Sequence, residues 1–107
     1  MQLLAILIQI VTLTTYMPTV RECDSSPNIT ASGYRIGSSN KKIIAVSRDL
    51  KKTLKWGDRV LVSNAGIFNG IYYVHDLMNK RHTKRIDILI HNKKLSTKMN
   101  NVYVSKL

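Results

Sequence analysis

Short runs of alternating hydrophobic and polar residues cover most of this chain, and turn-forming residues separate them. Alternation with a period of two is typical of β-strands, and clusters of glycine, asparagine and proline interrupt strands. This pattern predicts strands at residues 11–16, 43–46, 59–63, 71–75, 85–90 and 102–105. It also predicts extended structure and a turn at 29–33, and a short helix within 91–101. One or two helical turns are expected at 47–54, with Ser47 as N-cap and Asp49 in the first turn.

Six or seven short strands with little helix predict an all-β fold. A small barrel suits this pattern, because closure of the sheet removes its exposed edges. The chain has 107 residues, which is the size of one compact domain. We therefore expect one barrel over residues 11–107, with one or two short helices.

The N-terminal segment, residues 1–10, is the most apolar part of the chain. It is too short for a transmembrane helix, which needs about 20 apolar residues. Its length fits the hydrophobic region of a secretory signal, although no Lys or Arg precedes it and no Ala-x-Ala cleavage site follows. Two interpretations stay open: a degenerate export or anchor signal, or a buried strand that leads into Val11.

The charge is strongly positive, with 17 Lys and Arg against 6 Asp and Glu, a formal net charge of +11. Such a surface attracts nucleic acid, anionic membranes or anionic cell-wall polymers, or simply keeps a small domain soluble. A hydrophobic content of 44% excludes a disordered polycation. The single cysteine, Cys23, excludes an internal disulfide and a multi-cysteine zinc site, and three scattered histidines do not replace one.

Two aspartates stand out by position. Asp76 follows an apolar strand, and Asp87 lies between Ile86 and Ile88, 87 − 76 = 11 residues later. Aspartate is depleted in strands, so an acid at such a place has a local reason to be there. Alternation supplies a simple one: Asp87 faces water while its two neighbours face the core.

Six short motifs follow one another in a characteristic order. They are Tyr16-Met17-Pro18, Thr30-Ala31-Ser32-Gly33, Ile44-Ala45-Val46-Ser47, Gly57-Asp58-Arg59-Val60, His75-Asp76 and Ile86-Asp87-Ile88. In this order they resemble the 3D domain, a double-psi β-barrel named for three aspartates. That domain is found in lytic transglycosylases of the A type and in bacterial wall-remodelling proteins, and is related to rare-lipoprotein-A-like proteins and expansins. The resemblance, from about Val11 to the C-terminus, implies a six-stranded double-psi barrel.

The chain departs from the family at two places. The first of the three family aspartates falls on Ser47, so two remain. The loop after the second aspartate is rich in Thr and Gly in the family, whereas here it reads Leu77-Met78-Asn79-Lys80-Arg81. Both departures affect the expected glycan contacts and rate more than the fold.

The resemblance implies that Asp87 performs both proton transfers of a lytic transglycosylase. It would protonate the oxygen between N-acetylmuramic acid and N-acetylglucosamine and then deprotonate the muramoyl C6 hydroxyl, which closes a 1,6-anhydro ring. This requires a raised pKa, for which Asp76 is the expected neighbouring carboxylate. The nearby cations Lys80, Arg81, Lys84 and Arg85 act in the opposite direction. Glycan contacts are expected from Tyr16, Thr30, Ser32, Ser47 and Lys80, with no metal and no cofactor.

Three functions remain as hypotheses. The first is a peptidoglycan-cleaving enzyme of a bacterial envelope, periplasm or secreted lysis system, including one encoded by a bacteriophage. The second is a non-catalytic, expansin-like barrel that binds glycan. The third is a nucleic-acid-binding module, for which the net charge is the only support, and we expect no specific nucleic acid partner. The expected partners are peptidoglycan glycan strands and the anionic wall surface, bound by a monomer.

Overall fold

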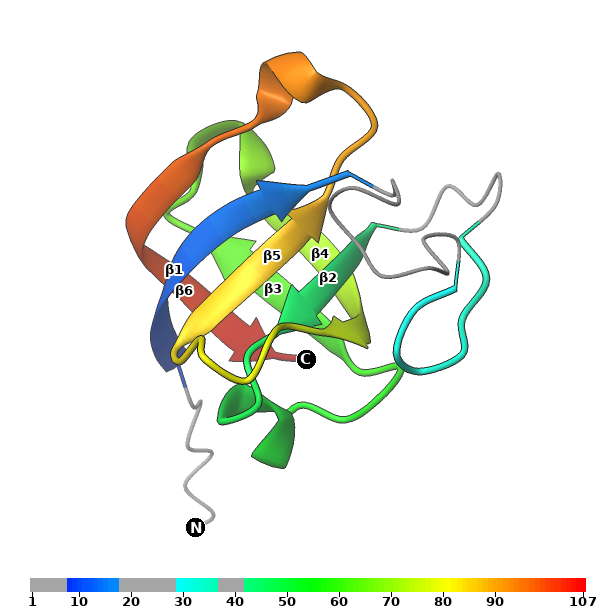
Figure 1. Cartoon of the computed structure of the whole chain (residues 1–107). Helices are drawn as coiled ribbons and strands as arrows, with labels where there is room; N and C mark the ends of the chain where they lie inside the picture. Colours follow the sequence, from blue (N-terminus) through cyan, green and yellow to red (C-terminus); the bar gives the residue numbers. More distant parts are fainter. Residues whose placement is uncertain (1–7, 18–28, 37–41) are drawn as a thin grey trace, which may run out of the picture.

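Six strands form a closed barrel in the computed structural model, which describes residues 8–17, 29–36 and 42–107 (Figure 1). The strands are β1 (Ile8–Tyr16), β2 (Ile43–Val46), β3 (Arg59–Ser63), β4 (Gly70–Leu77), β5 (Arg85–Leu89) and β6 (Lys98–Lys106). Three single-turn 3-10 helices lie between them: η1 (Leu50–Lys52), η2 (Gly66–Phe68) and η3 (Lys93–Leu95). The predicted small all-β barrel of six strands is confirmed. No helix among the described residues is both long and apolar enough to cross a membrane.

The strand order has an internal two-fold relation. Around the barrel the strands run β1, β5, β2, β4, β3, β6, and β6 pairs with β1. The β1–β5 and β2–β4 pairs are parallel and the other four are antiparallel. Exchanging β1 with β4, β2 with β5 and β3 with β6 gives the same order of neighbours around the barrel. The two parallel pairs are related in this way and are joined through the antiparallel β2–β5 pair.

The first strand begins earlier than its sequence pattern predicts. It starts at Ile8 and pairs with β6 from Ile8 to Thr14, so residues 8–10 of the apolar N-terminal segment belong to the strand. Ile8 and Ile10 are 55% and 58% exposed, however, so this part of the strand is not buried. The export-signal interpretation concerns residues 1–10, of which residues 1–7 lie outside the described residues.

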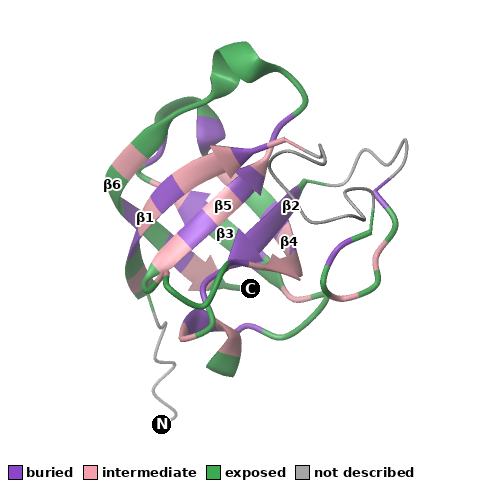
Figure 2. Ribbon diagram, viewed as in Figure 1, coloured by how far each residue is buried: buried purple, intermediate pink, exposed green. Residues whose placement is uncertain are grey.

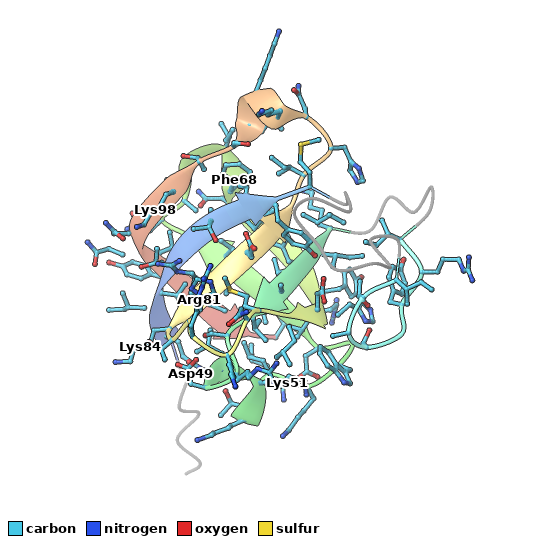
Figure 3. All side chains as sticks on the ribbon, in the orientation of Figure 1. Asp49, Lys51, Phe68, Arg81, Lys84 and Lys98 are labelled. Atoms are coloured by element: carbon cyan, nitrogen blue, oxygen red, sulfur yellow. The ribbon has the colours of Figure 1, made fainter. Side chains whose placement is uncertain are left out.

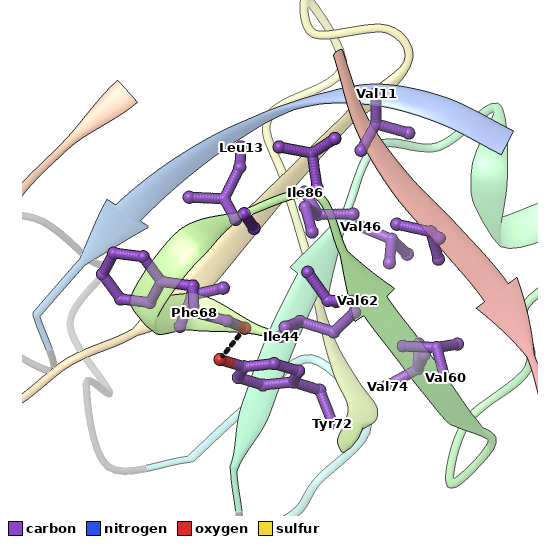
Figure 4. Packing of buried hydrophobic residues seen from close by; sticks show 14 of the residues in the cluster. Val11, Leu13, Ile44, Val46, Val60, Val62, Phe68, Tyr72, Val74 and Ile86 are labelled. Atoms are coloured by element: carbon purple, nitrogen blue, oxygen red, sulfur yellow. Dashed lines mark hydrogen bonds between the residues drawn. The ribbon is translucent and has the colours of Figure 1, made fainter. Parts of the chain in front are cut away.

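Alternation along the strands places one set of side chains inside the barrel. Figure 2 shows buried and part-exposed residues alternating along β1 and β5, and Figure 4 shows the interior packing. The interior is mainly aliphatic, and its largest fully buried members include Leu13, Ile44 and Ile86. Tyr72 is also buried, and its hydroxyl donates to the Phe68 carbonyl oxygen at 2.7 Å (Figure 4). This bond satisfies the one polar atom that Tyr72 brings into the core.

Ser47 does not cap a helix as predicted. The helix η1 begins at Leu50, and Asp49 stands at its N-cap position without a side-chain hydrogen bond to the helix. The Ser47 hydroxyl instead accepts from the Arg85 backbone N–H at 3.1 Å, and the Ser47 N–H donates to the Arg85 carbonyl at 2.9 Å. The prediction fails because the neighbouring strand β5 offers Ser47 both a donor and an acceptor.

Candidate functional site

The two predicted aspartates lie on one outer face of the barrel. Thr14 pairs with Asp87, Asp87 with Ala45, and Ala45 with Asp76, so these four residues form a row across β1, β5, β2 and β4. Neighbouring strands are about 4.8 Å apart, which places the two aspartate α-carbons roughly 10 Å apart. Asp76 was expected as the carboxylate neighbouring Asp87, and the structure places the two on strands that β2 separates.

A β-bulge at His75 turns Asp76 outward. Ile44 pairs with Val74, but the next residue, Ala45, pairs with Asp76, so His75 is an extra residue of β4. Simple alternation would place Asp76 on the same side as the fully buried Val74. The extra residue reverses the alternation, as bulges do where they re-aim a side chain. Asp76 therefore joins the outer face of the sheet.

The carboxylate of Asp76 connects three parts of the chain. Its Oδ2 accepts from the Tyr16 hydroxyl at 3.1 Å. Its Oδ1 accepts from the backbone N–H groups of Ala31 and Leu77, each at 3.0 Å. Asp76 thereby anchors the end of β1 and the segment 29–36 to β4.

Tyr16 supports this anchor from inside a small outer cluster. Its side chain is 8% exposed and belongs to a cluster with Ala45 and Met78, against which Leu89 packs. A ring covered in this way offers little surface on which a sugar could stack. Tyr16 therefore acts on the candidate site through its hydroxyl and Asp76, rather than as the exposed glycan contact that was predicted.

Thr30 and Ser32 hold the segment 29–36 against the bulge. The Thr30 hydroxyl is buried, lies 2.9 Å from the Ser32 hydroxyl and accepts from the Tyr34 N–H. The Ser32 hydroxyl lies 3.0 Å from Nδ1 of His75, and the Tyr34 ring stacks on the His75 ring at 4.4 Å. Of the two predicted contact residues, half-buried Ser32 is nearer the surface, and Thr30 is structural.

Asp87 is half-buried and has a hydroxyl neighbour. The Thr14 hydroxyl donates to Asp87 Oδ1 at 3.0 Å, while Ile86 and Ile88 on either side point into the core. This arrangement fixes the strand and orients the carboxyl group at the surface. Sequence reasoning missed Thr14, although its position two residues before Tyr16 placed both on one face of a predicted strand.

The remaining two predicted contact residues differ in accessibility. Ser47 is fully buried, and its hydroxyl is used by the Arg85 backbone, so contact between Ser47 and a glycan is wrong for this structure. Lys80 is exposed in the loop between β4 and β5. It stays a candidate contact residue.

Replacing Asp76 with alanine is expected to release the segment 29–36. The Ala31 N–H loses a charged acceptor, and a hydrogen bond to a charged group contributes about 1.5–3 kcal/mol. We expect amide hydrogen exchange at Ala31 to accelerate by about tenfold or more. Tyr16→Phe is the matched control, because it removes one donor to Asp76 and leaves the acceptor of Ala31 in place. Unchanged exchange at Ala31 in Asp76→Ala would contradict the anchoring role.

Among the residues that the structure describes, no group of three or more His, Cys, Asp or Glu side chains is arranged so that it could hold a metal ion.

Comparison with known protein families, with characterised proteins and with solved structures finds no match to this chain.

Proposed function

We propose that this protein binds glycan strands of peptidoglycan along the outer face of β1 and β5, beside the cluster of Tyr16, Ala45 and Met78 that covers β2, and cleaves them as a lytic transglycosylase. The observation that carries the proposal is the row in which Asp87, oriented by Thr14, shares a face with the anchored Asp76. The ordered motifs that resemble the 3D domain support the same activity. In this proposal Asp87 is the general acid and base, and Asp76 is a positioning residue.

The reaction needs one carboxyl group. Protonated Asp87 donates its proton to the glycosidic oxygen, the bond from this oxygen to the muramoyl C1 breaks, and the N-acetylglucosamine hydroxyl leaves. The Asp87 carboxylate then takes the proton of the muramoyl C6 hydroxyl, whose oxygen forms the new bond to C1. Asp87 is thereby protonated again, and no water is consumed. The separation between Asp87 and Asp76 is no obstacle, because the second carboxyl group of a hydrolase is not required.

A second candidate function is glycan binding without cleavage, and Arg85 favours it. Arg85 lies two residues before Asp87, on the same strand and the same face. A nearby cation favours the charged form of a carboxyl group. A carboxylate at this position would accept hydrogen bonds from sugar hydroxyls and would not donate a proton. This function keeps the same face and the same polymer.

The products formed from purified sacculi test the proposal. We expect the wild-type protein to release 1,6-anhydromuropeptides, identified by mass spectrometry. Muropeptides with reducing ends would instead show hydrolysis and overturn the proposed mechanism. An absence of products, with the protein still sedimenting with sacculi, would overturn cleavage and leave the binding barrel.

A further inference from the structure

Two basic loops meet where β5 begins. One loop, residues 47–58, connects β2 to β3, and the other, residues 78–84, connects β4 to β5. The backbone N–H of Lys84 donates to Asp49 Oδ2 at 2.9 Å and holds the two loops together. We name this region the basic end, and define it by eight residues: Arg48, Lys51, Lys52, Lys55, Lys80, Arg81, Lys84 and Arg85. Figure 3 shows the labelled Asp49, Lys51, Arg81 and Lys84 in this part of the molecule.

The acids near the basic end do not neutralise it. They are Asp49 and Asp58, and desolvation alone would raise the pKa of each carboxyl group. Hydrogen bonds outweigh desolvation and lower the pKa of Asp49, and hydrogen bonds together with the charges of Lys106 and Lys51 lower the pKa of Asp58, so both acids are charged. These two acids stand against eight cations. The ion pair found among the described residues joins Asp58 to Lys106 at 3.1 Å and uses none of the eight cations. A positive excess therefore stays at the surface.

Two arginines of this end contact the ring of His82, each at a different nitrogen. Arg85 Nη1 lies 3.2 Å from His82 Nδ1, and Arg81 Nε lies 3.4 Å from His82 Nε2. Desolvation and the charges of Arg85 and Arg81 lower the pKa of His82, which keeps its ring neutral at pH 7. A neutral imidazole accepts at one nitrogen only, so the ring cannot serve both guanidinium groups. Each guanidinium group therefore keeps donors for another acceptor, and guanidinium groups are suited to recognition of carboxylates.

The basic end adjoins the proposed glycan face. Arg85 and Asp87 lie on the same side of β5, and two residues of a strand span about 7 Å. A glycan strand in contact with Asp87 would therefore bring its peptide stems, which end in carboxylates, close to Arg81 and Arg85. Stacking of nucleic-acid bases has less support here. The exposed Trp56 has the Lys51 ammonium over its ring at 4.3 Å, which covers an aromatic surface that bases would use.

We infer that the basic end is a subsite for the carboxylates of peptidoglycan peptide stems, and that the protein selects glycan strands with free rather than amidated stems. The position of this subsite rests on the proposed function, because Asp87 fixes where the glycan lies. Recognition of the stems, however, is a binding property that is measured whether or not the glycan is cleaved.

Binding to two forms of the same sacculi tests the inference without any variant. One sample keeps its carboxyl groups, and in the other they are converted chemically to amides. We expect the wild-type protein to sediment with untreated sacculi at least about tenfold more tightly, which corresponds to about 1.4 kcal/mol. Equal affinity for both samples would overturn the inference. Cleavage products are measured separately, so a failure of the proposed function remains distinguishable.

A pair of charge-matched variants locates the subsite. Arg81→Gln with Arg85→Gln removes two cations from the basic end, and Lys93→Gln with Lys94→Gln removes two from η3, which follows the opposite end of β5. We expect only the arginine variant to bind untreated sacculi several-fold more weakly, with no change for amidated sacculi. Equal losses in both variants would show that net charge alone attracts the wall. Tight binding of an oligonucleotide that depends on Arg81 and Arg85, without the preference between sacculi, would assign the basic end to nucleic acid instead.

Discussion

Replacing Asp87 with asparagine is expected to lower release of 1,6-anhydromuropeptides from sacculi by at least about a hundredfold. A general acid or base contributes roughly 10²–10⁴ to a rate, and here one carboxyl group would serve as both. The amide oxygen of asparagine still accepts from the Thr14 hydroxyl, so the strand pairing and the fold should persist. Sedimentation with sacculi should therefore survive while cleavage is lost.

Two further variants separate the role of Asp87 from a general loss of negative charge. Asp58→Asn removes one carboxylate from outside the glycan face and should cleave at nearly the wild-type rate. Asp76→Asn should reduce cleavage less than Asp87→Asn and should also loosen the segment 29–36, because Asp76 acts by anchoring that segment. Cleavage that persists in Asp87→Asn would exclude Asp87 as the acid and base.

The strands of this barrel are readable from sequence where an apolar run ends at charged or turn-forming residues. Residues 43–46 and 59–63 were predicted with the bounds that β2 and β3 have in the structure. Lysines precede the first run, and Trp56-Gly57-Asp58 precedes the second, so local chemistry marks where each strand begins. The beginning of β1 at Ile8 was less clear, because Ile8 and Ile10 are apolar but belong to the outward-facing side chains of the strand.

The candidate site depends on contacts between residues that are far apart in the chain. The local sequence pattern does not reveal such contacts. The outward direction of Asp76 comes from the bulge at His75, which exists only in the register between β4 and β2. The burial of Ser47 comes from its pairing with Arg85, 38 residues later. Alternation and capping rules describe one segment at a time. Pairing with β2 therefore changed the predicted direction of Asp76, and pairing with β5 replaced the predicted capping role of Ser47.

The composition gives the net charge, and the fold shows where the positive side chains lie. A net charge of +11 is compatible with many partners. The contact between Lys84 and Asp49, 35 residues apart, brings two basic loops to one end of the barrel. Arg85 lies two residues from Asp87 on the same face of β5. The positive charge therefore bears on which substrate this face binds, and not only on the solubility of the protein.

Replacing Leu13 with alanine is expected to lower the free energy of unfolding by about 3 kcal/mol, within the 2–5 kcal/mol typical of a buried Leu-to-Ala change. Leu13 is fully buried, points into the barrel from β1 (Figure 4) and pairs with Ile86 of β5 and Met99 of β6. Its loss therefore leaves a cavity where three strands meet, and the closed sheet limits how far they move to fill it. Urea unfolding measures the change. Ile10→Ala is the matched control on the same strand, since Ile10 is 58% exposed and should lose less than about 1 kcal/mol. A similar loss in both variants would contradict the inward direction of Leu13 on which the outward direction of Thr14 depends.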